Sequence, residues 1–160
     1  MDTGLVLRQV GFAHPDAQLL VAQVQQEYVV RYGGPDDTAF EGTVFDPPSG
    51  AFFVGYLGGV PSACGGWRFR VDVAALGGVR AAEVKRMYVA QPARRAGHAR
   101  VVLAHLESSA RNAGADVMVL ETGLKQPEAI GLYTSSGYQP VQPFGHYAWS
   151  PTARYYGKRL

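Results

Sequence analysis

The segment from Glu83 to Ala113 limits the possible folds more than any other part of the chain, because a strand pattern, a turn and a helix pattern follow one another directly. β-Branched, aromatic and other apolar residues predict a strand that ends near Ala90, and Pro92 cannot donate to a sheet ladder. Apolar residues at spacings of four then predict an amphipathic helix from Gly97 to about Ala113. Strand and helix are therefore joined by a short turn.

Small and basic residues fill this turn. It reads Arg94, Arg95, Ala96, Gly97, His98, Ala99 and Arg100. The first turn of a helix has unpaired N–H groups and the positive end of the helix dipole, and glycine lets the backbone approach a ligand closely. The turn thus predicts an anion site that suits a pyrophosphate, although an arginine-rich turn can also be ordinary surface.

The remaining patterns predict an α+β fold with a mixed, mostly antiparallel sheet of about six to seven strands. The glycine pairs at residues 58–59 and 77–78 are hairpin signals, so three strands form an antiparallel meander. A strand, crossover helix and strand around the central segment predict one parallel pair. The other expected elements are strands at 5–10, 51–57, 60–70, 117–122, from 138 and at 153–160, and helices at 15–32 and 127–137.

Length and composition bound the class of protein. The 160 residues fit one domain, 1–160, and no apolar run reaches the ~20 residues that span a bilayer. The first ten residues do not resemble a secretory signal, and the one cysteine, Cys64, excludes an internal disulfide. We expect a cytoplasmic protein with no membrane partner and no metal site, in which Cys64 is a small buried hydrophobe rather than a nucleophile.

Two segments resemble the signatures of the GNAT N-acetyltransferase superfamily. Arg94, Gly97 and Ala99 fill the pattern Gln/Arg-x-x-Gly-x-Gly/Ala of its acetyl-coenzyme A pyrophosphate loop. The segment from Gln126 to Tyr138 resembles the later signature Asn-x-x-Ala-x-x-Leu-Tyr-x-x-x-Gly-Phe, with Gln and Tyr replacing the first and last residues. The resemblance implies a single-domain GNAT fold and an acetyl-coenzyme A cofactor.

It also implies the reaction, which is transfer of the acetyl group to a primary amine of a small molecule or peptide by direct attack in a ternary complex. Such a reaction needs a neutral amine, donors for a developing oxyanion and a proton for the departing thiolate. Tyr133 matches the family tyrosine that serves the leaving sulfur, and a phenol with a pKa of about 10 is protonated at pH 7. The alternative for Tyr133 is packing against the sheet.

Glu83 stands where some members of the family place a strand glutamate as general base. Strand alternation puts Glu83, Lys85, Met87 and Val89 on one face if no bulge intervenes. Glu83 could equally pair with a neighbouring basic residue, and Glu121 on the following strand is a second candidate base.

The cofactor contacts come from the resemblance too. The backbone amides of Met87 and Val89 match positions that hold the thioester carbonyl and the pantetheine arm. Gln126 and Tyr133 would contact the same arm. The phosphate contacts would be Arg94, Arg95, Ala96, Gly97, His98, Ala99 and Arg100, chiefly through main-chain N–H groups, with His98 a bystander to the chemistry rather than a catalyst.

Two other classes of function compete with this reading. A non-catalytic acyl-coenzyme A sensor would keep the phosphate loop and lose acid and base, whereas Tyr133 and Glu83 are both present. A nucleic-acid partner is not expected, because the net charge is only +2 and no Gly-Lys-Ser/Thr or RNA-binding signature follows the basic turn.

The acceptor site is expected in three segments without a motif: the 36–48 loop, the hairpin strands and an aromatic loop at 140–151. The aromatic loop could wall the acceptor pocket or simply pack. The first loop has four acidic residues that hint at a cationic substrate or are solvated loop charges: Asp36, Asp37, Glu41 and Asp46. The tyrosine-rich 154–157 segment could pair across a homodimer or complete the sheet of a monomer.

Overall fold

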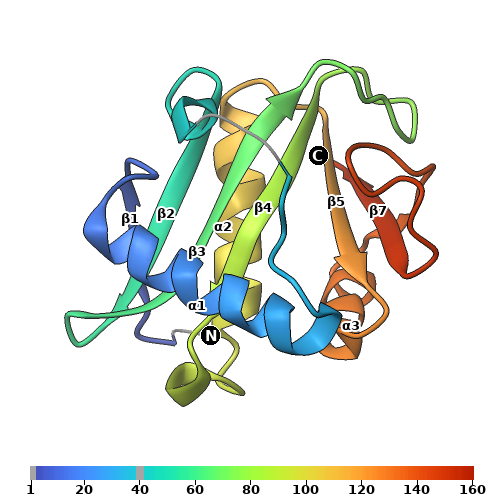
Figure 1. The fold of residues 1–160 in the computed structure, drawn as a ribbon. Helices are drawn as coiled ribbons and strands as arrows, with labels where there is room; N and C mark the ends of the chain where they lie inside the picture. Colours follow the sequence, from blue (N-terminus) through green and yellow to red (C-terminus); the bar gives the residue numbers. More distant parts are fainter. Residues whose placement is uncertain (1–2, 39–41) are drawn as a thin grey trace.

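The computed structural model describes residues 3–38 and 42–160, and within these ranges the chain forms a seven-stranded sheet with three α-helices (Figure 1). In chain order the elements are β1 (Val6–Val10), α1 (Pro15–Tyr32), the 3₁₀ helix η1 (Gly42–Phe45), β2 (Gly50–Leu57), β3 (Val60–Arg70), β4 (Ala81–Val89), the 3₁₀ helix η2 (Gln91–Ala93), α2 (His98–Asn112), β5 (Val117–Gly123), α3 (Pro127–Ser135), β6 (Gln139–Pro140) and β7 (Ala153–Arg159). The α+β prediction and the number of strands are confirmed.

The sheet has the order β1-β2-β3-β4-β5-β7-β6, and its one parallel pair is β4 with β5, joined by the crossover helix α2. This pair is short. Its register runs only from Ala81 opposite Val117 to Glu83 opposite Val119. Beyond these residues the two strands continue unpaired with each other, so a gap opens in the middle of the sheet.

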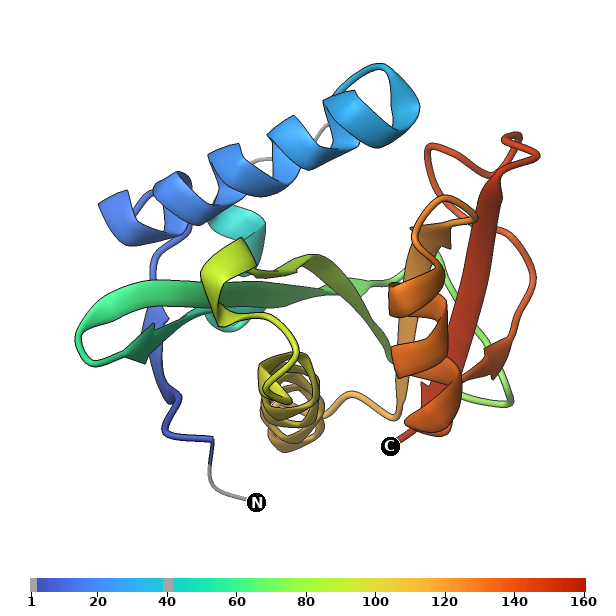
Figure 2. The same cartoon turned by 90° about the horizontal axis from the view of Figure 1, so that it is seen from below.

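The helices cover both faces of the sheet, with α1 on one face and α2 on the other (Figure 2). The predicted apolar stripe of α2 is buried in a large cluster that includes Trp67 and Met118, and α3 packs on the same cluster through Tyr133. Leu20 and Val24 of α1 are buried against Phe52 on the opposite face. α1 ends at Gly33, whose φ of 81° is accessible to glycine at little cost.

A β-bulge interrupts β4 and overturns the simple alternation predicted for it. Cys64 of β3 pairs with Tyr88, but Gly66 pairs with Lys85, so β4 has one extra residue, and Arg86 takes a φ of 56°. Met87 therefore packs against the core cluster under α2, together with Val89. Glu83 and Lys85 instead line the second cavity described below, so these four side chains do not share one face.

Two further expectations concern Cys64 and the last strand. Cys64 is fully buried, its thiol donates to the Arg86 carbonyl at 3.2 Å, and burial raises its pKa to about 12, which makes it a packing residue. β7 pairs with β5 on one side and β6 on the other, so the tyrosine-rich segment completes the sheet of its own chain. Among the described residues, no helix is both long and apolar enough to cross a bilayer.

Candidate active site

The first cavity, here called the α2 cavity, occupies the gap between β4 and β5 and has a volume of about 580 Å³. It runs from the turn before α2 to the side of α3. Its walls include the predicted loop residues Arg94, Arg95, Gly97, His98, Ala99 and Arg100, the strand residues Met87 and Val89, and Gln126 and Tyr133. The structure therefore brings the residues predicted to bind the cofactor together around one cavity, apart from Ala96, which lies between two of its lining residues. Glu83, predicted as a candidate base, does not line this cavity.

The turn before α2 exposes main-chain donors. Within the described residues, none of the N–H groups from Arg95 to Arg100 donates a hydrogen bond to another group of the chain. Gly97 has a φ of 84°, and a Cβ built there would meet only a side-chain atom of Thr3, at 3.7 Å. The N–H groups, the dipole of α2 and the open space at Gly97 together make a cradle for an anion.

The arginines around this turn are already bound to the protein. Arg94 forms an ion pair of 2.7 Å with Glu27 of α1 and donates to the Val89 carbonyl at 2.9 Å. Arg100 donates to the hydroxyls of Ser135 at 2.7 Å and Ser136 at 3.3 Å. These contacts hold the turn against α1 and α3, so the main-chain N–H groups are its most available donors.

His98 begins α2 and is buried, with 5% of its surface exposed. It lines the α2 cavity, and its Nδ1 atom has no hydrogen-bond partner among the described residues. A buried polar atom normally has a partner, so an unpaired one on a cavity wall indicates room for a polar ligand atom. This position suits the cofactor-binding role predicted for His98 from the sequence, which stays a prediction.

Tyr133 lies at the inner end of the α2 cavity, with 7% of its surface exposed. Burial raises the pKa of its phenol well above the ordinary value, so the hydroxyl keeps its proton at neutral pH. Its ring packs edge-on against Tyr138 at 5.8 Å between centroids, and the Tyr138 hydroxyl donates to Glu107 at 2.8 Å. Tyr133 is thus both a core residue and a protonated phenol on the cavity wall.

A second cavity of about 390 Å³, the Lys85 cavity, adjoins the first. The two share six lining residues, which mark their junction: Tyr28, Val84, Arg86, Glu121, Thr122 and Gln126. The walls that belong to the Lys85 cavity alone come from the end of α1, the loop after it, β4, the end of β5 and the loop before β7. The hairpin strands β2 and β3, which were expected to contribute, do not line it.

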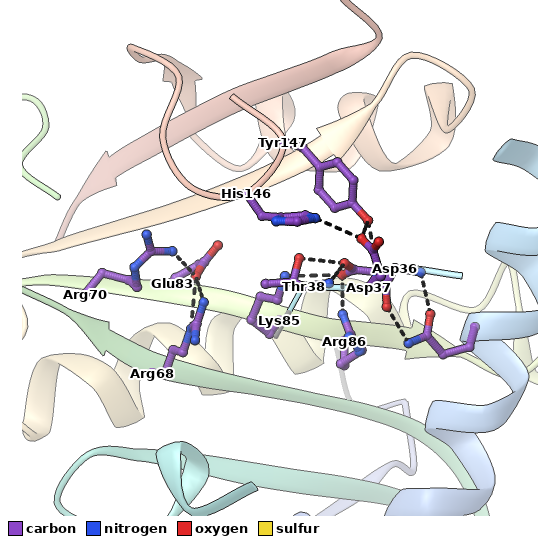
Figure 3. A network of polar contacts seen from close by, with 11 residues as sticks. Asp36, Asp37, Thr38, Arg68, Arg70, Glu83, Lys85, Arg86, His146 and Tyr147 are labelled. Atoms are coloured by element: carbon purple, nitrogen blue, oxygen red, sulfur yellow. Dashed lines mark hydrogen bonds and ion pairs between the residues drawn. The ribbon is translucent and has the colours of Figure 1, made fainter. Parts of the chain in front are cut away.

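Asp36 anchors one wall of the Lys85 cavity (Figure 3). Its carboxylate forms an ion pair with Arg86, a second of 3.3 Å with the Lys85 ammonium, and accepts from the Thr38 hydroxyl at 2.6 Å. The backbone of Asp36 is held twice by the Gln25 side chain, at 2.8 and 3.0 Å. Although burial alone would raise the pKa of Asp36, the two cations lower it well below the ordinary value.

Asp37 connects this wall to the aromatic loop. His146 contacts its carboxylate at 3.0 Å, the Tyr147 hydroxyl donates to it, and its N–H donates to the same hydroxyl at 3.0 Å (Figure 3). Burial and this contact raise the pKa of Tyr147 to about 12. The aromatic loop therefore does wall a cavity, as one of the two readings of the sequence held.

The acidic residues of this region do not make an acidic pocket. The negative charge of Asp36 is balanced by the two cations Lys85 and Arg86. The carboxylate of Asp37 is bound by His146 and Tyr147. Asp46 lines neither cavity, and Glu41 lies outside the described residues. The hint of a cationic substrate therefore finds no support in the geometry.

The two candidate bases differ in their surroundings. Glu83 has 3% of its surface exposed and forms ion pairs of 2.8 Å with Arg70 and 3.1 Å with Arg68. Pairing with basic residues was one of the two alternatives that the sequence left open for Glu83. Glu121 lies at the junction of the two cavities. Its pKa is raised to about 7, chiefly by burial and also by the charges of Asp36 and Glu83, while Lys85 is the main group that opposes the rise. Glu121 can therefore exchange a proton near neutral pH.

Several residues of the site carry no signal in the sequence. Lys85 and Arg86 meet Asp36 about fifty positions away, and His146 and Tyr147 meet Asp37 more than a hundred positions away. These contacts form because the sheet brings the loop that follows α1 close to β4 and to the loop that precedes β7. The one clue in the sequence is that two cations, Lys85 and Arg86, stand next to each other within the predicted central strand.

Comparison with known proteins agrees with this geometry. The model of the Acetyltransferase (GNAT) family matches residues 19–138. An IAA acetyltransferase of Azospirillum brasilense is 42% identical over 79 residues, which cover 49% of this chain and 51% of that protein, so the match spans about half of each.

Solved structures show the same fold over almost the whole chain. A protein of Klebsiella pneumoniae assigned as an acyl-CoA N-acyltransferase has a TM-score of 0.78 at 23% identity, covering 99% of both chains. A GNAT acetyltransferase of Elizabethkingia anophelis with acetyl-CoA bound has a TM-score of 0.69 at 14% identity, covering 99% of this chain and 100% of that one. With a family model that spans most of its length and this fold, the chain belongs to the GNAT acetyltransferase family.

Proposed function

We propose that the protein is an acetyl-coenzyme A-dependent N-acetyltransferase that modifies the primary amine of a small molecule by direct attack in a ternary complex. The observation that carries the proposal is the junction of the two cavities. One cavity ends in a main-chain anion cradle, the other has polar and aromatic walls, and Glu121 lies where they meet, with Tyr133 at the inner end of the first. The family assignment and an IAA acetyltransferase among its relatives support acyl transfer.

The residues of the α2 cavity fit acetyl-coenzyme A. The N–H groups from Arg95 to Arg100 would hold the pyrophosphate, and the unpaired Nδ1 of His98 offers a further polar contact. The exposed edge of β4 at Met87 and Val89 would hold the pantetheine arm, since β5 no longer pairs there. When bound, acetyl-coenzyme A supplies the activated thioester.

Glu121 is our proposed general base. An amine must lose its proton before it can attack, and a carboxylate with a pKa of about 7 can accept a proton near neutral pH without being permanently protonated. Glu83 is committed to two arginines and lies deeper, so we assign it the role of a positioning residue that raises the pKa of Glu121 by its charge.

Tyr133 is our proposed general acid. Its raised pKa keeps the phenol protonated, and it faces the α2 cavity rather than the Lys85 cavity, as a donor to a leaving sulfur must. Backbone N–H groups of β4 at the bulge would serve as donors to the carbonyl oxygen, because the β4–β5 pairing has already ended.

The experiment is calorimetric titration with acetyl-coenzyme A, followed by a thiol-release screen across small amines, polyamines and peptides. Binding with amine-dependent thiol release is the expected result. Binding without release for any amine would favour the alternative of a non-catalytic acyl-coenzyme A sensor. Failure to bind acetyl-coenzyme A would overturn the proposal.

A further inference from the structure

The Lys85 cavity carries an excess of positive charge. Its lining contains three carboxylates, on Asp36, Glu83 and Glu121, and three cations, on Lys85, Arg86 and Lys125. Glu83, however, is matched from behind by Arg68 and Arg70, which do not line the cavity. With Glu83 neutralised by these arginines, the three cations of the lining face only two carboxylates.

One carboxylate serves two of the cations. The same oxygen of Asp36, Oδ2, receives both Arg86 and Lys85, and the Lys85 contact of 3.3 Å is the longer of the two. An ammonium has three N–H donors, so one long contact leaves Lys85 with donors to spare. Only 10% of the Lys85 side chain is exposed, so its charge is largely removed from water where it faces the cavity.

The position of Lys85 relative to Glu121 matters. Lys85 is the leading charged group that lowers the pKa of Glu121, so the two side chains interact across the cavity. An acceptor whose amine reaches Glu121 thus brings the rest of its structure close to an ammonium. A second cation, Lys125, is exposed at the cavity rim, with its ammonium 5.8 Å from the centre of the Tyr32 ring.

The remaining walls suit a small, flat molecule. Aromatic rings of Tyr28, Tyr32, Tyr147 and Trp149 line the cavity, and Trp149 has 75% of its surface exposed. A volume of about 390 Å³ is at the small end of ligand pockets. A long polyamine with only positive charges would meet Lys85 and Lys125 as like charges.

We propose that the acceptor is a small amine that also carries a carboxylate, such as an amino acid, and that Lys85 is the specificity-determining residue that binds this carboxylate. The inference rests on the proposed function, since it names the substrate class of the same site. It predicts that the enzyme discriminates between acceptors by the charge of the group that accompanies the reacting amine.

The test uses the twenty standard amino acids and their carboxamides, which keep the amine and side chain and lose the negative charge. We expect at least one amino acid to bind, by calorimetry, about tenfold or more tightly than its carboxamide, and to show a similar preference in kcat/KM for thiol release. Equal or tighter binding of the carboxamides, or no binding of any amino acid, would overturn the inference.

Variants assign the preference to Lys85. Lys85→Met should abolish the carboxylate preference and leave the affinity for acetyl-coenzyme A unchanged, and Lys85→Arg should restore part of it. Arg111→Met removes an exposed cation of α2 that lines neither cavity and should keep the full preference. A preference that survives Lys85→Met in a protein that still binds acetyl-coenzyme A would contradict the role of Lys85.

Failure of this inference and failure of the proposed function are distinguishable. Amino-acid binding is measured without acetyl-coenzyme A, so it tests the Lys85 cavity alone. Acetyl-coenzyme A binding and thiol release with carboxamides or simple amines test the α2 cavity and the chemistry, whatever the acceptor preference.

Discussion

The α2 cavity and the Lys85 cavity are neighbours built in different ways. The anion cradle of the first comes from seven consecutive residues and uses mainly backbone groups, so it depends on local conformation and on Gly97. The second is assembled from five separate parts of the chain and held by side-chain ion pairs and hydrogen bonds that bridge 49 to 110 positions. A cavity of the first kind can recognise a common cofactor, and one of the second kind can be specific to its own substrate.

The largest expected effect on turnover comes from Glu121, at the junction of the two cavities. If one cavity were sufficient for the reaction, a change at this junction would have little effect. Glu121→Gln keeps the shape and removes the base, so we expect kcat to fall by about 10³-fold. In the wild type, the carboxylate is the active form, so kcat/KM should rise with pH through about 7 and lose this dependence in the variant. Initial rates from pH 5.5 to 9 measure both effects.

Glu83→Gln is the matched control for that experiment. It breaks two buried ion pairs, with Arg68 and Arg70, and should lower the free energy of unfolding by about 3 kcal/mol. In the folded fraction, kcat/KM should still rise with pH, but with a midpoint below that of the wild type, because the charge of Glu83 raises the pKa of Glu121. If instead Glu83→Gln removes the pH dependence and Glu121→Gln does not, Glu83 is the base.

The next largest effect is expected at the inner end of the α2 cavity. Tyr133→Phe removes only the hydroxyl, so kcat should fall by about 10²-fold while the Kd of acetyl-coenzyme A stays nearly unchanged. Tyr138→Phe removes a neighbouring buried hydroxyl outside both cavities and should leave kcat near the wild-type value. Unchanged turnover in Tyr133→Phe would remove its role as an acid.

A smaller effect tests whether the backbone of the turn is the anion site. Gly97→Asp adds a carboxylate beside the N–H groups and should raise the Kd of acetyl-coenzyme A by about tenfold, which is about 1.4 kcal/mol. Gly97→Asn has nearly the same shape and tolerates a positive φ to a similar degree, so it separates charge from strain. Equal affinities of the two variants and the wild type, measured by calorimetry, would exclude this turn as the phosphate site.

The smallest effect on cofactor affinity is expected for Arg94, which fills the first position of the pyrophosphate-loop pattern. Because Arg94 is paired with Glu27 at a half-exposed position, Arg94→Ala should raise the Kd of acetyl-coenzyme A by less than about fivefold. The same titration measures it. A loss greater than that of Gly97→Asp would mean that side-chain charge, and not the backbone, dominates binding.

The sequence predicted most of the fold because its signals are local. Pro15 and Gly33 bound α1, the glycine pair at 58–59 joins β2 to β3, and the helix after Gly97 begins within one residue of its expected start. The predictions for the phosphate turn and for Tyr133 also come from local patterns, and they stay predictions. Each of these features depends on residues close together in the chain.

The errors arose where distant residues decide the structure. The bulge at Arg86, which separates Glu83 from Met87, follows from the pairing of β4 with β3, and no glycine or proline within β4 marks it. The compensation of Asp36 by Lys85 and Arg86 depends on the loop after α1 returning over β4. No pattern in either segment alone reports that contact.

The early end of the β4–β5 ladder has a kinetic consequence. Because the strands part after Glu83 and Val119, the α2 and Lys85 cavities meet at six residues and otherwise have separate walls. Acetyl-coenzyme A in the first cavity and an acceptor in the second would then contact largely separate walls, and neither would have to depart to admit the other. Initial velocities plotted against one ligand at fixed levels of the other should give intersecting lines rather than the parallel lines of a double-displacement enzyme.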